Sequence, residues 1–229
     1  MIQRWEDLTF LHWRYPVDEV QRQLPPGLTV EPYDGSAWVG LVPFRLWVGL
    51  AVPVGRALSL GALGLFPETN VRTYVRDAEG RTGIWFFSLD AARLAAVVVG
   101  RRTFHLPYHW SSMRVERRGR TVRYTCRRRW PGPELPASRV AVEAGQRYHE
   151  GELGELDHWL TARWLLFGRA PTGSLLLVHA AHAPWPLHRG RVVELDDQLV
   201  TACGLPPPAG EPLVHMSPGV SSRIGPPHR

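Results

Sequence analysis

The sequence contains no lysine, and all of its 27 basic residues are arginines. A chain without lysine has no side-chain amine to form a Schiff base, so mechanisms of that kind are excluded. Abundant alanine, glycine and proline accompany the arginines, which is typical of codon bias in a GC-rich genome. A selective reason stays open, because a guanidinium group binds carboxylates and phosphates through two parallel hydrogen bonds.

Cysteine is scarce, and export signals are missing. Cys126 and Cys203 lie too far apart in sequence to suggest a disulfide framework or a Cys-x-x-Cys motif. The first seven residues lack the basic-then-apolar order of a signal peptide. The most apolar window, residues 46–66, is interrupted by Pro53, Arg56 and several glycines, so we interpret it as a loop or lid and not as a membrane span. We therefore expect a cytoplasmic protein with no membrane partner.

Motifs for cofactors and activated nucleophiles are also missing. The chain has no glycine-rich phosphate loop at a strand–helix junction and no Gly-x-Ser-x-Gly sequence. His179 and His182 are three residues apart on an expected strand, so their side chains face opposite sides. Since no other histidine spacing matches a metal site, we expect neither a metal nor a cofactor.

The composition is that of an ordinary globular protein, with 44% hydrophobic and 21% charged residues. This length and composition favour one domain over residues 1–229. The formal net charge of +6 suits an acidic partner, although arginine also serves simply as the solubilising surface residue. The sequence leaves the oligomeric state undecided, and a homo-oligomer stays open.

Strand signals outnumber helix signals, which predicts a mostly β (α+β) fold of barrel-like form with a few short helices. Two hairpins are clear, one from residues 69–76 and 82–90 and one from residues 113–117 and 121–128. Helices are expected over residues 16–24 and 155–167, and residues 91–99 also fit a short helix. Further strands are expected over residues 28–30, 37–42 (ending at Pro43), 175–181 and 192–195, with the tail from Pro206 as surface coil.

The first hairpin carries the strongest functional signal. Because side chains alternate along a strand, Glu68, Asn70, Arg72 and Tyr74 share one face. The opposite face is β-branched throughout, which is typical of a packed layer. The polar face either meets solvent or lines a barrel interior or cleft, and four different hydrogen-bonding side chains in series favour the second interpretation.

The partner strand supports that interpretation. A two- or four-residue connection would place Arg72 opposite Trp85 and Asn70 opposite Phe87, whereas a three-residue connection would shift this register by one. Large aromatic side chains beside charged groups are typical of a ligand pocket. We therefore expect Trp85 and Phe87 to form its apolar wall.

Five more side chains are candidates for ligand binding. His105 and Tyr108 follow an arginine pair and could take part in acid–base chemistry, or could simply end a strand. Arg128 shares a face of the second hairpin with Val122, Tyr124 and Cys126, so it is expected to point inward. His182 and Trp185 follow the strand over residues 175–181 and are expected at the pocket.

The order and content of several motifs resemble the YqjF-like family, also called domain of unknown function 2071, along nearly the whole chain. These motifs include Leu11-His12-Trp13, Asp34-Gly35-Ser36-Ala37-Trp38, Glu68-Thr69-Asn70-Val71-Arg72, Phe104-His105-Leu106-Pro107-Tyr108, Leu160-Thr161-Ala162-Arg163-Trp164, His182-Ala183-Pro184-Trp185 and His215-Met216-Ser217. That family is similar to the acetoacetate decarboxylase-like superfamily, so the resemblance implies a β-barrel or double sheet that encloses a cavity. The decarboxylase needs a catalytic lysine, which this chain lacks, so that activity cannot be carried over.

Three functions remain as hypotheses. In the first, the pocket takes a small anionic metabolite, a carboxylate or oxo acid, held by Arg72 with Arg128, while Glu68 acts as acid or base in a lyase or isomerase. In that hypothesis the candidate catalytic residues are Glu68, Arg72 and Tyr74. In the second, the same pocket binds or senses a small molecule without catalysis. In the third, the arginines of the second hairpin bind nucleic acid, which is disfavoured because no exposed aromatic residues are interleaved with them.

Overall fold

The structure is a computed structural model that describes residues 1–51, 57–59, 64–149 and 151–229. It is 57% strand and 12% helix. The strands are β1 (Ile2–Tyr15), β2 (Leu28–Val30), β3 (Ala37–Ala51), β4 (Ala57–Ser59), β5 (Leu65–Asp77), β6 (Thr82–Ala91), β7 (Tyr108–Arg118), β8 (Thr121–Trp130), β9 (Ala137–Arg147), β10 (Leu165–Arg169), β11 (Leu175–His182), β12 (His188–Asp197) and β13 (Leu213–Ile224). The helices are α1 (Val17–Gln21), α2 (Leu94–Thr103) and α3 (Glu155–Thr161), with a 3₁₀ turn, η1 (Thr201–Cys203). Within the described residues, none of the helices has the length and apolar character that crossing a bilayer requires.

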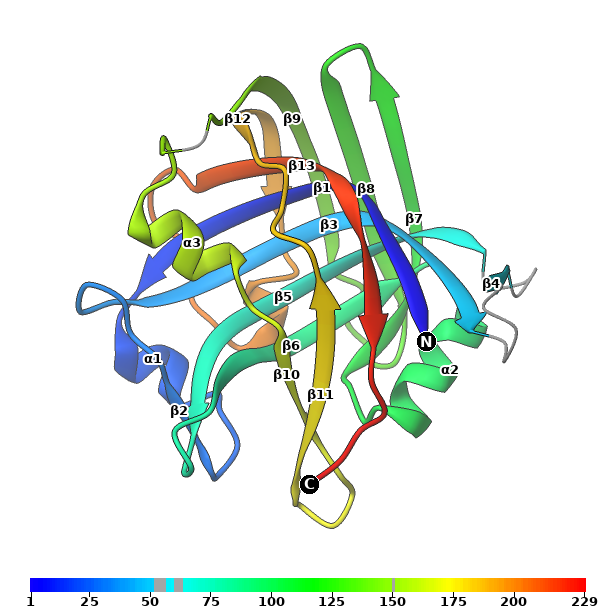
Figure 1. Ribbon diagram of the computed structural model, residues 1–229, viewed down its shortest axis with the longest axis vertical. Helices are drawn as coiled ribbons and strands as arrows, with labels where there is room; N and C mark the ends of the chain where they lie inside the picture. Colours follow the sequence, from blue (N-terminus) through cyan, green and yellow to red (C-terminus); the bar gives the residue numbers. More distant parts are fainter. Residues whose placement is uncertain (52–56, 60–63, 150) are drawn as a thin grey trace.

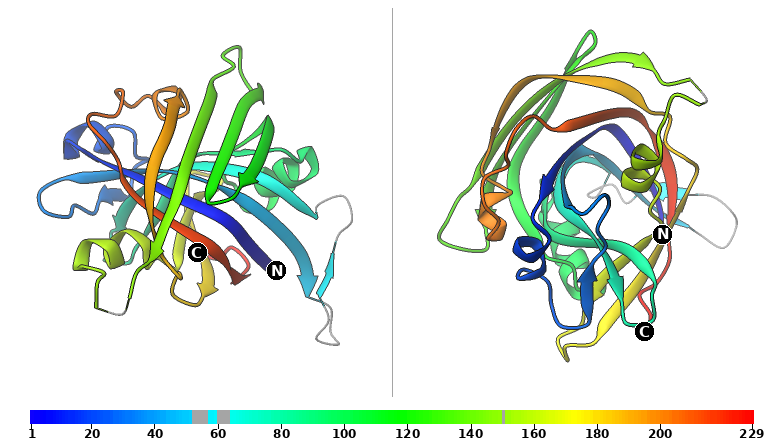
Figure 2. Two further views of the ribbon diagram at one scale, coloured as in Figure 1. Left: turned by 90° about the horizontal axis from the view of Figure 1, so that it is seen from above. Right: turned by 90° about the vertical axis from the view of Figure 1, so that its left-hand side faces the viewer.

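Nine strands close into a barrel, which confirms the predicted fold class. Their order is β6-β7-β8-β9-β12-β13-β1-β3-β5, and β5 pairs back with β6. The strands curve round a common interior in the right-hand view of Figure 2. β1 lies between β3 and β13, so the two ends of the chain meet in neighbouring strands.

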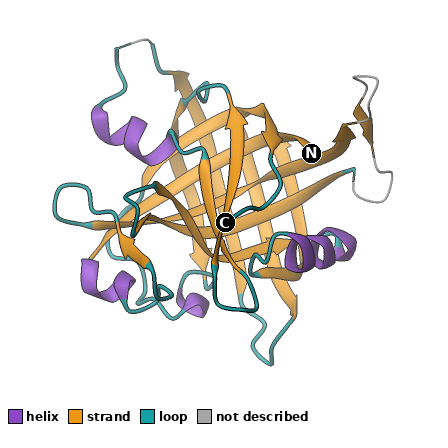
Figure 3. Cartoon of the chain, turned by 60° about the horizontal axis from the view of Figure 1, so that its bottom comes forward, coloured by secondary structure: helices purple, strands orange, loops and turns teal. Residues whose placement is uncertain are grey.

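A second layer covers part of the barrel from outside. β10 pairs with β6 in parallel, and β11 joins β10 to the end of β13. β10, β11 and α3 lie in front of β1, β3, β5 and β6 in Figure 1, and Figure 3 shows strands running in two crossing directions. The four covered barrel strands therefore have two buried faces, one toward the barrel interior and one toward this layer.

Apolar side chains fill the barrel interior. A single cluster draws on all nine barrel strands, through Leu11, Leu41, Val71, Phe87, Met113, Tyr124, Val140, Val192 and Met216. Val20 of α1 and Leu199, Val200 and Leu205 around η1 belong to the same cluster. The interior is thus a packed core, and a cavity of useful size has to lie elsewhere.

Several predicted elements are correct. Both hairpins form, α1 lies within the helix expected over residues 16–24, and β2 and β11 match their expected ranges closely. The ambiguous alanine-rich segment is helical from Leu94 onward as α2. The segment interpreted as a loop or lid is strand over most of its described residues: residues 46–51 extend β3, residues 57–59 form β4, and residues 65–66 begin β5. Residues 52–56 and 60–63 lie outside the described residues.

Two predictions about boundaries were wrong. β3 continues through Pro43, which lies opposite an irregularity in the β1–β3 ladder between Glu6 and Leu11, where a residue without an N–H is tolerated. The helix expected over residues 155–167 ends at Thr161, and its apolar continuation becomes β10 because β6 and β11 offer it pairing partners. A helical period and a short buried strand are difficult to distinguish in such a run.

The chain ends also differ from expectation. The tail expected as coil contains β13, which pairs with β1, β11 and β12. Pro218 lies where the β1–β13 register skips Asp7, so the ladder tolerates a residue without an N–H there. The sequence predicted no strand over the residues of β1 and β9, although both are barrel strands.

Candidate functional site

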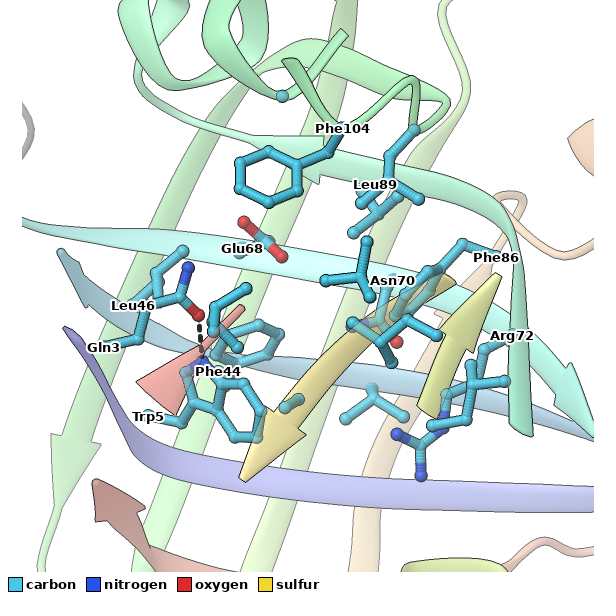
Figure 4. A pocket seen from close by; sticks show the side chains of 18 of the residues that line it. Gln3, Trp5, Phe44, Leu46, Glu68, Asn70, Arg72, Phe86, Leu89 and Phe104 are labelled. Atoms are coloured by element: carbon cyan, nitrogen blue, oxygen red, sulfur yellow. Dashed lines mark hydrogen bonds between the residues drawn. The ribbon is translucent and has the colours of Figure 1, made fainter. Parts of the chain in front are cut away.

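A cavity of about 350 Å³ lies between the outer face of the barrel and the second layer. Most of its wall is apolar, contributed by β3, β5, β6, α2, β10 and β11 through residues such as Phe44, Phe66, Phe86, Val99, Leu166 and Val178. Glu68, Asn70 and Arg72 of β5 project into it in a row (Figure 4). The site is therefore an apolar chamber with a short line of polar groups on one wall.

The alternation of β5 explains this row. Val71 packs in the barrel core, whereas its neighbours Asn70 and Arg72 face the cavity. All eight residues from 68 to 75 are buried, so the polar face does not meet bulk solvent. The outward face of β5 is a cavity wall because the second layer covers it. No local pattern in β5 predicts this layer.

The predicted register of the hairpin was wrong. Asn70 lies opposite Leu89 and Arg72 opposite Phe86, with an irregularity between Val71 and Arg72. The cavity wall on β6 consists of Ile84, Phe86 and Leu89. Trp85 and Phe87, expected there, turn to the opposite face and pack in other clusters. An extra residue at the irregularity reverses the facing of a strand, and sequence alternation cannot reveal it.

Arg72 is a buried cation without an acidic partner. Its side chain is 7% exposed, and within the described residues no carboxylate lies in salt-bridge range of it. One terminal nitrogen, Nη2, donates to the Leu160 carbonyl at 3.3 Å and to the Tyr74 hydroxyl at 3.4 Å. Its Nε has no hydrogen-bond partner, and the guanidinium lies 5.1 Å from the centre of the Phe10 ring. A buried and unpaired charge of this kind lowers the stability of the fold unless a bound anion neutralises it.

A second arginine lies at the same end of the cavity. Arg163, which follows α3, lines the wall and pairs with Glu31 at 2.8 Å. Its Nη2 is buried and has no hydrogen-bond partner. Because Glu31 neutralises Arg163, the two guanidinium groups together leave one uncompensated positive charge.

Tyr74 supports this end of the site from behind and is not among the side chains that line the cavity. Its hydroxyl donates to the Leu160 carbonyl at 2.6 Å and lies 2.7 Å from His12 Nε2. Burial raises the pKa of Tyr74 and lowers the pKa of His12 well below its usual value, so both side chains are neutral at pH 7. Tyr74, predicted to be catalytic, therefore lies behind the cavity wall, where its hydroxyl contacts Arg72.

Glu68 lies at the opposite end of the polar row and is 3% exposed. Burial raises its pKa from 4.5 to about 8, against the opposing effect of a hydrogen bond from Tyr108, and Asp90 raises it further. The Tyr108 hydroxyl donates to Glu68 Oε2 at 3.2 Å. At neutral pH the Glu68 carboxyl therefore holds its proton, and this proton is available to a molecule in the cavity.

The remaining candidates divide between the cavity and other places. Tyr108, His182 and Trp185 line it, with the His182 and Trp185 rings 5.0 Å apart. His105 does not line it and adopts a positive φ of 51° after α2. Arg128 is buried as expected, but on the core face, where it forms two hydrogen bonds with Asp90. Two nitrogens of Arg128, Nε and Nη2, are thus bound to Asp90, and Arg128 is not among the residues that line the cavity.

Sequence reasoning also missed Trp5 and Arg163, which line the cavity, and His12, which contacts Tyr74 behind it. Trp5 stacks on Trp185 at 5.5 Å and closes the cavity beside Phe44. His12 and Arg163 fall inside motifs that carry the family resemblance, which was the available signal for them. Within the part of the chain that the structure describes, no group of three or more metal-ligating side chains converges.

Comparisons with known proteins agree on family and fold. Residues 2–221 match the family model described as "Uncharacterized conserved protein", domain of unknown function 2071. The chain is 33% identical over 222 residues to the uncharacterized protein YqjF of Bacillus subtilis (strain 168), covering 95% of this chain and 87% of that protein.

Solved structures with this fold are much more distant in sequence. The enduracididine biosynthesis enzyme MppR, complexed with pyruvate, is 13% identical with a TM-score of 0.66, over 99% of this chain and 89% of that one. An acetoacetate decarboxylase-like enzyme from Sphingomonas wittichii RW1 is 14% identical with a TM-score of 0.63, over 100% and 92%. Acetoacetate decarboxylase from Legionella pneumophila is 13% identical with a TM-score of 0.61, over 100% and 88%. The chain therefore belongs to the domain of unknown function 2071 family and has an acetoacetate decarboxylase-like fold.

Proposed function

We propose that this protein binds a small organic anion, a carboxylate or an oxo acid, in the cavity beside β5. The observation that carries the proposal is Arg72, a guanidinium buried in an apolar chamber and without an acidic partner among the residues that the structure describes. Its free Nε and the free Nη2 of Arg163 are donors that a carboxylate would satisfy. MppR, which has the same fold, was solved in complex with pyruvate, and this supports an oxo acid as the ligand class.

Arg72→Met tests the proposal. A panel of carboxylates and oxo acids is titrated against the wild type by thermal shift and calorimetry. A charge-assisted hydrogen bond in an apolar site corresponds to about a tenfold to hundredfold change in affinity, so the variant should lose that much. The control is Arg76→Met, because Arg76 is an exposed arginine on the same strand and should leave binding unchanged. If no anion stabilises the wild type, or if both variants bind equally well, the proposal is wrong.

The same variant gives a second signature without ligand. An uncompensated buried charge destabilises the fold, so Arg72→Met should unfold at the same temperature as the wild type or higher. If Arg72 had only a structural role, the variant would unfold at a lower temperature, because the acceptors of its hydrogen bonds would lose their donor. This measurement also shows that any loss of binding does not come from misfolding.

Turnover is a second candidate, favoured by the protonated state of Glu68 at neutral pH. A carboxyl with a pKa near the working pH both donates and accepts a proton readily, as a lyase or isomerase requires. The other reading of the same pocket, a non-catalytic binding or sensing module, predicts that no product forms. Glu68→Gln separates the two: an enzyme loses turnover and keeps affinity, whereas a binding module keeps affinity and shows no turnover to lose. Product formation and solvent deuterium incorporation, both followed by NMR, are the readouts.

Nucleic-acid binding receives less support from the second hairpin. Four of its arginines, Arg114, Arg117, Arg120 and Arg123, form ion pairs with nearby carboxylates. Arginines engaged in this way present less free charge to a phosphate backbone. A gel shift at low salt would test it, and retarded nucleic acid with a steep salt dependence would revive this alternative.

A further inference from the structure

The polar row on β5 has a fixed length. Glu68, Asn70 and Arg72 lie on one face of β5, which pairs with β3 without irregularity along this stretch. Each residue of a strand adds about 3.3 Å, so the Cα atoms of Glu68 and Arg72 lie about 13 Å apart. Figure 4 shows the three side chains in a line, with Phe86, Leu89 and Phe104 beside them. The two ends of the row are too far apart for one small group to touch both.

The cavity is also larger than a three-carbon acid needs. Its volume of about 350 Å³ lies within the range of sites that enclose drug-sized molecules. A molecule of pyruvate size bound to Arg72 would leave the Glu68 end and most of the aromatic wall without contact. The apolar wall between the two ends, including Phe66 and Phe86, is suited to an apolar body.

The charges select a ligand with one negative group at one end. Arg72 supplies one uncompensated positive charge, since Arg163 is neutralised by Glu31. At the other end Glu68 is neutral at pH 7 and accepts a hydrogen bond from Tyr108, which leaves its own proton to be donated. A second carboxylate there would lose its hydration and gain no cation, so a dicarboxylate is disfavoured.

We propose that the ligand is an elongated monocarboxylate, most simply an aryl- or alkyl-substituted oxo acid, with its carboxylate on Arg72 and a hydrogen-bond acceptor at its far end on Glu68. A row about 13 Å long leaves roughly 7 Å for the ligand if a hydrogen bond of about 2.9 Å points along the row at each end, and more if those bonds point across it. This inference rests on the proposed anion site and adds the length and the far-end chemistry of its ligand.

Four oxo acids that share a head group test this inference. Affinities are measured at pH 7 for pyruvate, phenylpyruvate, 4-hydroxyphenylpyruvate and 2-oxoglutarate. Phenylpyruvate should bind at least about tenfold more tightly than pyruvate, because its ring buries apolar surface. The 4-hydroxyl group should add about threefold to tenfold through Glu68, and 2-oxoglutarate should bind more weakly than phenylpyruvate.

Two variants assign the far-end contact. Glu68→Leu should abolish the advantage of 4-hydroxyphenylpyruvate over phenylpyruvate and still bind both, whereas Glu68→Gln, which keeps a neutral donor, should retain part of that advantage. Unfolding temperatures without ligand verify that both variants fold. If pyruvate binds as tightly as the longer acids, or if the hydroxyl advantage survives Glu68→Leu, this inference fails while the anion site stands. If none of the four acids binds, the proposed function itself fails.

Discussion

The stability of this protein should depend on pH through one buried carboxyl, Glu68. Burial raises its pKa from 4.5 to about 8 in the folded chain. Between those two values the unfolded chain has released the proton while the native protein still holds it. The native state thus binds more protons, so stability falls as pH rises through this range. The contribution is fully present below about pH 4.5 and fully lost above about pH 8.

The size of the effect follows from the pKa difference. Each pH unit within the range removes about 1.4 kcal/mol, which amounts to about 3 to 5 kcal/mol over the full range. Glu68→Gln removes the titration and keeps the size and the hydrogen-bonding capacity of the side chain. The free energy of unfolding of the wild type and of the variant, measured by urea denaturation from pH 5 to pH 9, should therefore diverge in favour of the variant as pH rises.

Comparing the two proteins at each pH cancels all other titrating groups. Glu134→Gln, at an exposed glutamate, serves as the control and should follow the wild type throughout. A difference between Glu68→Gln and the wild type that stays constant from pH 5 to pH 9 would refute the reasoning, because it would mean that Glu68 ionises like an exposed carboxyl. The same loss of neutrality should weaken anion binding above pH 8.

Three further substitutions test the fold around the site. Arg128→Met should destabilise the protein by about 3 to 5 kcal/mol in thermal or urea unfolding, because it leaves the carboxylate of Asp90, which is 0% exposed, without its partner. Gly219→Ala should lower the free energy of unfolding more than Gly80→Ala does in the same assay. Both glycines have positive φ, but a Cβ at Gly219 would lie 1.9 Å from the backbone of β1, whereas a Cβ at Gly80 would meet no described atom within 4 Å. Phe167→Ala should cost about 3 to 5 kcal/mol, since this ring is fully buried, and an unfolding free energy within 1 kcal/mol of the wild type would contradict its place in the second layer.

Local patterns in the sequence determined a large part of this protein. Alternation along residues 68–75 separated Val71 from Asn70 and Arg72, and the turn residues around Gly80 and Gly119 marked both hairpins. The absence of lysine excluded a Schiff base without any structure. These features depend on neighbours a few residues apart, which is why a sequence displays them.

Tertiary structure alone decided where the cavity lies and what closes it. Whether the polar face of β5 meets solvent or an enclosed cavity depends on β10 and β11, which are about a hundred residues away in the chain. Because of the irregularity beside Arg72, Phe86 and Leu89 line the cavity wall in place of Trp85 and Phe87. Arg128 forms an ion pair with Asp90 on the core side of the barrel. Such outcomes depend on how strands pair and on which oppositely charged side chain lies close to a buried charge in the folded protein. The spacing of residues along one strand encodes neither of these.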